Sequence, residues 1–221
     1  MAKPSGLNKY EKDILQKASR ELQETDVEKY LNLKRLFKEI LLNQSDKQTK
    51  DEFRKYFINY YRLNAGGLTE EFKEEFFKIL FNESQMEKKE DPYTPILRQL
   101  YKFRRRKGDQ ALYGSFVSKL VAMHDDTSPI FDKYVNDFFG ISAPSSEYNI
   151  DFRIERFVTN IKRLRTIYAQ WSSDADFKEI LQCVRKKHPG LSDCADSRIA
   201  DLLVWTAGKG QIGKKVSPNK D

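Results

Sequence analysis

Helical periodicity is the feature of this sequence that most constrains its fold. Apolar residues recur every three or four positions along most of the chain, and no stretch shows sustained alternation of apolar and polar residues. The first spacing puts apolar side chains on one face of a helix, whereas alternation is typical of half-buried strands. The pattern therefore predicts an all-α bundle of about nine or ten helices.

Capping residues predict where these helices begin. Thr69, Thr94 and Ser128 stand at N-cap positions, and Pro95 and Pro129 suit the first helical residue. Residues 149–171 form the clearest amphipathic pattern. We expect helices over about 8–24, 25–41, 45–66, 69–81, 94–107, 110–123, 129–139, 149–171, 174–187 and 194–206.

The charge of the chain is unevenly distributed. The formal net charge is +7, from 40 lysines and arginines against 33 acidic residues. Residues 1–91 hold 18 basic and 18 acidic side chains, so residues 92–221 carry the whole excess. A one-sided positive field attracts phosphates, although a lysine-rich surface also serves solubility.

The stretch from Asn82 to Asp91 is polar, has no periodic apolar face and coincides with the change in charge balance. We interpret it as a candidate boundary. It separates a charge-balanced helical region, 1–91, from a basic helical region, 92–207, that contains the candidate site. The Gly-, Lys- and Ser-rich residues 208–221 have little to bury, which predicts a disordered basic tail.

Several classes of protein are excluded or disfavoured by missing signals. The chain has only two cysteines, Cys183 and Cys194, and two histidines, too few for a disulfide framework or a usual zinc site. The N-terminus has no apolar signal core, and no apolar run is long enough to span a membrane. Phosphate-binding glycine loops, Gly-x-Ser-x-Gly and His-Glu-x-x-His are absent. We expect a cytoplasmic protein with reduced thiols, no cofactor or metal, and no membrane contact.

The segment Leu112–Gly140 carries the strongest candidate site. It has the pattern of a helix, a short polar connection and a second helix, with Lys119 among apolar neighbours in the first. Asp132 falls in the first turn of the second helix, where free N–H groups and the helix dipole orient a carboxylate and keep it ionised. Such a group suits general-base or electrostatic catalysis. The alternatives are a surface lysine on an amphipathic helix and an ordinary capping acid.

This segment resembles the core of the helix-hairpin-helix DNA glycosylase superfamily. Gly114 and Lys119 match the first part of that family's pattern, with one glycine in the hairpin instead of the usual two, and Pro129, Asp132 and Val135 match the second. The resemblance implies an all-α DNA-repair hydrolase or lyase that acts on damaged or modified bases. It implies that Asp132 assists loss of the base and that Lys119 forms a Schiff base with the sugar.

The expected partner is DNA, held largely through its phosphates. In the resemblance, backbone N–H groups at the hairpin, here Gly114 and Ser115, hold one phosphate. Other phosphates would be neutralised by basic runs in the second half of the chain, which position a protein without reading sequence. The candidate residues of these runs are Arg104, Arg105, Arg106, Lys107, Lys162, Arg163 and Arg165.

Two alternatives remain beside the enzyme. The same helices could bind nucleic acid by charge alone and have no active site. The chain could instead be a protein-interaction module whose neutral N-terminal half docks a protein partner. DNA binding at low salt separates the second alternative from the others, because electrostatic binding is strongest there. No pattern in the sequence specifies an oligomeric state or a substrate base.

Overall fold

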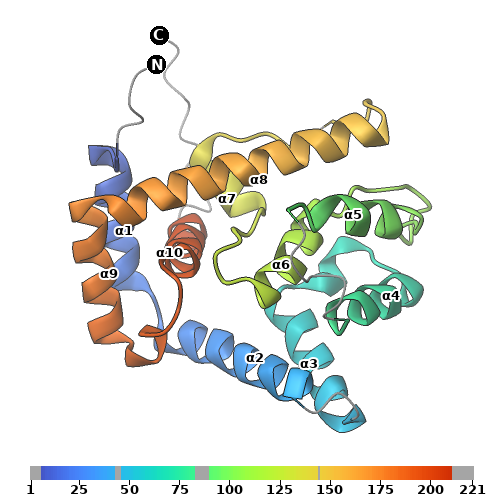
Figure 1. Cartoon of the computed structure of the whole chain (residues 1–221), viewed down its shortest axis with the longest axis horizontal. Coiled ribbons are helices and arrows are strands. Elements are labelled where there is room, and N and C mark those ends of the chain that lie inside the picture. Colours follow the sequence, from blue (N-terminus) through green and yellow to red (C-terminus); the bar gives the residue numbers. More distant parts are fainter. Residues whose placement is uncertain (1–5, 43–45, 83–89, 144, 211–221) are drawn as a thin grey trace.

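The computed structural model describes residues 6–42, 46–82, 90–143 and 145–210. In this part of the chain it contains ten α helices, two short 3-10 helices and no strand, which confirms the predicted all-α fold (Figure 1). The elements in chain order are α1 (Lys9–Glu21), α2 (Glu24–Leu42), α3 (Lys47–Tyr60), η1 (Leu63–Gly66), α4 (Glu70–Leu80), α5 (Tyr93–Tyr101), α6 (Gly114–His124), α7 (Lys133–Phe139), α8 (Ile150–Ser173), α9 (Ala175–Lys187), η3 (Pro189–Leu191) and α10 (Asp196–Gly210).

The long helix α8 connects two groups of helices. α1, α9 and α10 gather at one end of it, and α4, α5 and α6 lie toward the other (Figure 1). The first helix, α1, packs on the last two, α9 and α10, and α10 also packs on α7 and α8. The buried hydrophobic residues form one cluster that extends from Leu15 to Ala207. Helices from both parts of the sequence therefore contribute to one core.

Local capping explains most helix starts. The Thr69 hydroxyl accepts a hydrogen bond from the N–H of Phe72 at 3.3 Å, so the predicted cap of α4 is confirmed. Helix α5 differs from the prediction, because it begins at Tyr93, with Pro92 rather than Thr94 at the N-cap position. The carboxylate of Asp91, one residue earlier, accepts from the N–H groups of Tyr93 and Thr94 at 2.9 and 3.2 Å.

Helix α5 is also shorter than predicted. It ends at Tyr101, so the expectation of a helix that continues through Arg104–Lys107 is wrong. Arg104 instead forms an isolated antiparallel bridge with Gln110, and Gly108 turns the chain with a φ of 85°. These turn contacts satisfy backbone groups that a longer helix would have used.

The predicted start of a helix at Pro129 is wrong as well, because α7 begins at Lys133. The preceding residues are held in an extended segment by side chains from elsewhere. The N–H of Ile130 donates to Asp201 at 3.1 Å, and the N–H of Phe131 donates to the Ser118 hydroxyl at 2.9 Å. This shift makes Asp132 the N-cap of α7 rather than a residue inside its first turn.

The last helix extends further than predicted. α10 continues to Gly210, so the expected tail does not begin at Gly208; the rest of the predicted tail, 211–221, lies outside the described residues. A Cβ atom at Gly208 would lie 2.5 Å from the ring of Tyr134, so the absence of a side chain lets α10 pack closely on α7. None of the helices in the described ranges has both the length and the apolar character of a membrane span.

Candidate functional site

Lys119 lies on α6 and is buried, with 6% of its surface exposed. The alternative of a surface lysine is therefore wrong. Its Nζ donates to the hydroxyl of Ser115 at 2.7 Å and to the carbonyl of Ser115 at 3.3 Å. The rings of Tyr61 and Phe116 lie 5.6 and 6.0 Å from the same nitrogen, close enough to interact with its positive charge.

Burial changes the acid–base behaviour of this amine. Desolvation lowers the pKa of Lys119 below its ordinary value, while the negative charges of Asp132 and Asp201 oppose this effect. A lower pKa leaves a larger fraction of the amine neutral near physiological pH. The neutral amine is the form that attacks carbonyl and sugar carbons, so the environment of Lys119 favours nucleophilic chemistry.

Asp132 combines a structural contact with a position facing Lys119. Its Oδ1 accepts a hydrogen bond from the N–H of Val135 at 3.1 Å and caps α7. Its Oδ2 lies 4.0 Å from the Nζ of Lys119, and its side chain is 16% exposed. The expected capping role is present, and the second oxygen remains directed toward the amine.

Lys119 and Asp132 line the same cavity, which we call the central cavity. Its volume is about 150 Å³. Five aromatic side chains dominate its wall, and charged and aliphatic residues complete it. The aromatic residues are Tyr30, Tyr60, Tyr61, Tyr134 and Trp205, and the others are Arg62, Ile130, Val135, Arg198, Asp201 and Leu202. A cavity with aromatic walls and a few polar groups suits a planar ring with polar edges.

A buried polar network on α10 holds the connection between the two candidate residues. Arg198 donates to Asp201 at 2.7 Å and to the carbonyl of Ser128 at 2.9 Å. Asp201 accepts further hydrogen bonds from the hydroxyl of Tyr168 at 2.8 Å and from the N–H of Ile130. The network therefore ties α10 and α8 to the segment between Lys119 and Asp132.

Sequence reasoning missed this network, although a signal exists. Arg198 and Asp201 are three residues apart in a helix whose neighbouring residues are mostly apolar, which places both charges on one buried face. Burial raises the pKa of Asp201 to about 7, against the opposing effects of Arg198, Tyr168 and the Ile130 N–H. A carboxyl group that titrates near neutral pH in a cavity is typical of functional sites.

An open groove of about 650 Å³ adjoins the central cavity and shares Asp132 with it; we call it the α6 groove. Gly114 and Ser115 at the start of α6 line it, and their N–H groups have no acceptor among the described residues. Tyr113 precedes them with a φ of 58° and does not cap the helix. A Cβ on Gly114 would lie 2.6 Å from the ring of Phe157, so glycine permits the close approach of α6 to α8.

Arg153, which sequence reasoning did not single out, also lines the α6 groove. The residue is 7% exposed, and its Nε has no hydrogen-bond partner in the described part of the chain. Its guanidinium lies 5.9 Å from the ring of Tyr101. Free N–H groups at a helix start and a guanidinium without a carboxylate partner form a site suited to an anion.

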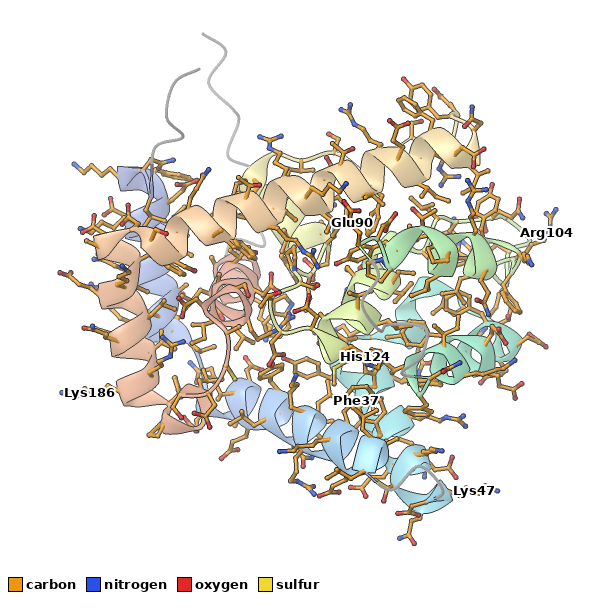
Figure 2. All side chains as sticks on the ribbon, viewed as in Figure 1. Phe37, Lys47, Glu90, Arg104, His124 and Lys186 are labelled. Atoms are coloured by element: carbon orange, nitrogen blue, oxygen red, sulfur yellow. The ribbon has the colours of Figure 1, made fainter. Side chains whose placement is uncertain are left out.

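Most of the predicted basic residues that follow α5 contact neighbouring groups. Arg104 lies at the end of the molecule away from Lys186 of α9 (Figure 2). Arg105 lines the α6 groove but is paired with Asp109. The guanidinium of Arg104 donates to the carbonyl of Gly108 at 2.7 Å, and Arg106 lies 3.7 Å from Glu70. Lys107 is exposed and lines neither the central cavity nor the α6 groove.

The basic residues of α8 also differ among themselves. Lys162 and Arg163 are exposed and line neither the central cavity nor the α6 groove. Arg165 is half-buried and donates to the Ser128 hydroxyl at 2.6 Å and to Asp125 at 3.2 Å. Arg165 therefore supports the loop before α7 rather than offering a free charge.

Within the described residues, no group of three or more His, Cys, Asp or Glu side chains is placed to hold a metal ion. Comparisons of the chain with protein-family models, with curated proteins and with solved structures found no match. The residues of the central cavity and its surroundings are therefore the basis for a function of this chain.

Proposed function

We propose that the chain is a DNA-binding enzyme with glycosylase or lyase activity on damaged or modified bases. The central cavity would receive a nucleotide turned out of the duplex, since chemistry on a base requires its removal from the stack. One observation carries the proposal. A buried amine, Lys119, and a carboxylate, Asp132, lie 4.0 Å apart on the wall of an aromatic-lined cavity.

The proposed reaction uses both groups in turn. The lone pair of the neutral Lys119 amine forms a bond to C1′ of the deoxyribose as the bond from C1′ to the base breaks. The base leaves with the bonding electrons and takes up a proton from water. Asp132 stabilises the positive charge that develops on the sugar and accepts a proton from the nitrogen that has bonded to C1′. The lone pair of this nitrogen then forms a C=N bond as the bond from C1′ to O4′ breaks, and O4′ takes the proton from Asp132. The opened sugar is left as a protonated Schiff base at Lys119.

The α6 groove supports the DNA contact that this chemistry needs. The free N–H groups of Gly114 and Ser115 can donate to a phosphate, and Arg153 places a positive charge in the same groove. Lys133, at the start of α7, is exposed in the groove. These groups would hold the strand beside the nucleotide that enters the central cavity.

Covalent trapping on abasic DNA tests the role of Lys119. Incubation with a duplex that carries one abasic site, in the presence of cyanoborohydride, should give an adduct that mass spectrometry assigns to Lys119. The Lys119→Gln variant should give none. Lys73→Gln is the matched control, because Lys73 is also buried but donates to Glu70 and Asn64 away from the cavity. An adduct that survives in Lys119→Gln would exclude Lys119 as the nucleophile.

Release of the base tests Asp132. The Asp132→Asn variant keeps an oxygen that can cap α7, so the fold should persist. Release of damaged bases should fall roughly 10²- to 10⁴-fold while DNA binding remains. DNA binding by the wild-type protein with neither adduct nor base release would favour a non-enzymatic nucleic-acid-binding protein. Failure to bind DNA at about 50 mM salt would favour a protein-interaction module, since electrostatic binding is strongest at low salt.

A further inference from the structure

A second groove continues the central cavity on the side of α10. We call it the α10 groove; its volume is about 310 Å³, and it is lined by Lys29, Tyr56, Tyr60, Arg62, Trp205 and Lys209, with Asp26 and Asn59. Tyr60, Arg62 and Trp205 line both the groove and the cavity. A ligand that fills the cavity would therefore have its neighbouring groups in this groove.

The α10 groove carries positive charge without full compensation. Lys29 on α2 and Arg62 after α3 are exposed, and neither side chain makes an ion pair or hydrogen bond within the described ranges. Asp26 is the single carboxylate in the lining, and its Oδ2 is already bound to the Nζ of Lys209 at 3.0 Å. Two cations thus remain available to an anionic ligand.

The end of α3 places Arg62 between the cavity and the groove. Arg62 directly follows Tyr61, the C-cap of α3, and has a φ of 53° and a ψ of 42°. This left-handed conformation is a common way for a helix to end. Tyr61 lines the cavity, and Arg62 lines both the cavity and the groove. The turn at the end of α3 therefore positions Arg62 where the cavity and the groove meet.

Aromatic rings also line the groove. Trp205 lies beneath Lys209, whose Nζ is 3.4 Å from the centroid of the ring, and Tyr56 lines another part of the wall. Cations interleaved with aromatic rings are typical of grooves that hold single strands of nucleic acid, where rings stack on bases and cations contact phosphates.

We infer that the α10 groove binds the phosphodiester backbone of the DNA strand whose nucleotide enters the central cavity, with Arg62 and Lys29 as phosphate contacts. The inference rests on the proposed function and extends it to a second contact surface. The α6 groove meets the cavity at Asp132, and the α10 groove meets it at Arg62. The strand would then be held on both sides of the nucleotide in the cavity.

Binding of a fluorescent duplex measures this contact directly. The duplex carries a tetrahydrofuran analogue of an abasic site, which cannot form a Schiff base, and anisotropy is recorded from about 50 to about 200 mM salt. Arg62→Gln and Lys29→Gln should each weaken binding roughly tenfold at the lowest salt and reduce the log–log salt slope by about 1. The matched controls are Lys38→Gln on α2 and Lys55→Gln on α3, two exposed lysines outside the groove, which should change the affinity less than about twofold.

The outcomes separate the inference from the proposed function. Wild-type affinity and slope in both Arg62→Gln and Lys29→Gln would overturn the inference, even if Lys119 is trapped on abasic DNA. Loss of binding in these two variants, with no adduct at Lys119, would support the groove and refute the proposed chemistry. Absence of wild-type binding at the lowest salt would overturn both. Thermal unfolding of every variant shows whether a loss of binding reflects a loss of fold.

Discussion

The effect of burial on the pKa of Lys119 can be tested through the reactivity of its amine. Because desolvation lowers its pKa below the ordinary 10.5, a larger share of the amine is neutral at a given pH than for an exposed lysine. With acetaldehyde and cyanoborohydride, the rate of alkylation of Lys119 should reach its plateau at lower pH than the rate of a lysine in an unstructured reference peptide in the same sample. Peptide mass spectrometry between about pH 6 and pH 10 measures each lysine separately.

Asp132 provides an internal check on this profile. Its negative charge raises the pKa of Lys119 against the effect of burial. The Asp132→Asn variant should therefore move the Lys119 profile to still lower pH and leave that of the reference peptide unchanged. Equal midpoints for Lys119 and the reference lysine would show that the amine is accessible to water.

Asp201 should make the stability of the protein depend on pH. Its pKa is about 7 in the folded protein, against an ordinary 3.8, so the folded state holds a proton that the unfolded chain has released. The stability that Asp201 contributes is therefore highest at low pH and falls as pH rises from about 4 to about 7, by about 4 kcal/mol at most.

Urea unfolding of the wild type and of Asp201→Asn measures this contribution. The wild-type free energy of unfolding minus that of the variant should fall across this pH range and be constant above about pH 8. Asp196→Asn serves as control, because Asp196 lies on the same helix in a partly exposed pair with Arg185 at 2.8 Å. A difference that rises with pH would mean that Arg198 outweighs burial at Asp201.

At the level of single residues, the sequence identified those whose partners are local. Lys119 and Asp132 are 13 positions apart and fall in one helix–loop–helix pattern, so spacing alone placed both on neighbouring elements. Arg62, Arg153 and Asp201 were missed because their significance depends on contacts with distant segments. Burial of Arg153 against Tyr101, for example, requires that α8 pack on the end of α5.

Asp132 has two roles, capping α7 and facing Lys119, and two substitutions can separate them. As the N-cap of α7 it satisfies the N–H of Val135, and loss of such a cap costs about 1 kcal/mol. Both Asp132→Ala and Asp132→Asn remove the negative charge that faces Lys119, and only Asp132→Asn keeps an oxygen that caps α7. We therefore expect Asp132→Ala to lower the free energy of unfolding by about 1 kcal/mol more than Asp132→Asn does. Urea unfolding checks the stabilities. Equal destabilisation by both substitutions would show that the charge, rather than the capping oxygen, stabilises α7.

The sequence predicted the start of a helix correctly where the capping hydrogen bond is local. It predicted the start wrongly where the hydrogen bonds come from distant residues. Thr69 and Asn149 cap α4 and α8 through N–H groups three residues away, and the predicted starts of both helices are confirmed to within a residue. The start of α7 moved because Asp201 and Ser118 hold the N–H groups of Ile130 and Phe131. No local pattern in the sequence contains those two contacts.

On the scale of the whole molecule, contacts between the ends of the chain support the site. α1 packs on α9 and α10, and α10 carries Arg198, Asp201 and Trp205 to the central cavity. Lys209, near the end of α10, is paired with Asp26 near the start of α2. The cavity therefore depends on helices that are more than 150 positions apart in the sequence, which explains why helical periodicity predicted the fold class but not the shape of the site.

Because these helices form one core, we expect a destabilising substitution in α1 to lower the stability of the whole protein. Leu15 is completely buried between α1 and the last helices, so Leu15→Ala should lower the free energy of unfolding by roughly 2–5 kcal/mol. Leu42→Ala is the control, because Leu42 is 74% exposed and its loss should cost less than about 0.5 kcal/mol.

Both tryptophans, Trp171 and Trp205, lie in the second half of the chain. If the single core unfolds cooperatively, their fluorescence and the circular dichroism of all helices should report the same shifted midpoint in Leu15→Ala. Separate transitions would show that the helices before Asn82 unfold independently of those that complete the cavity.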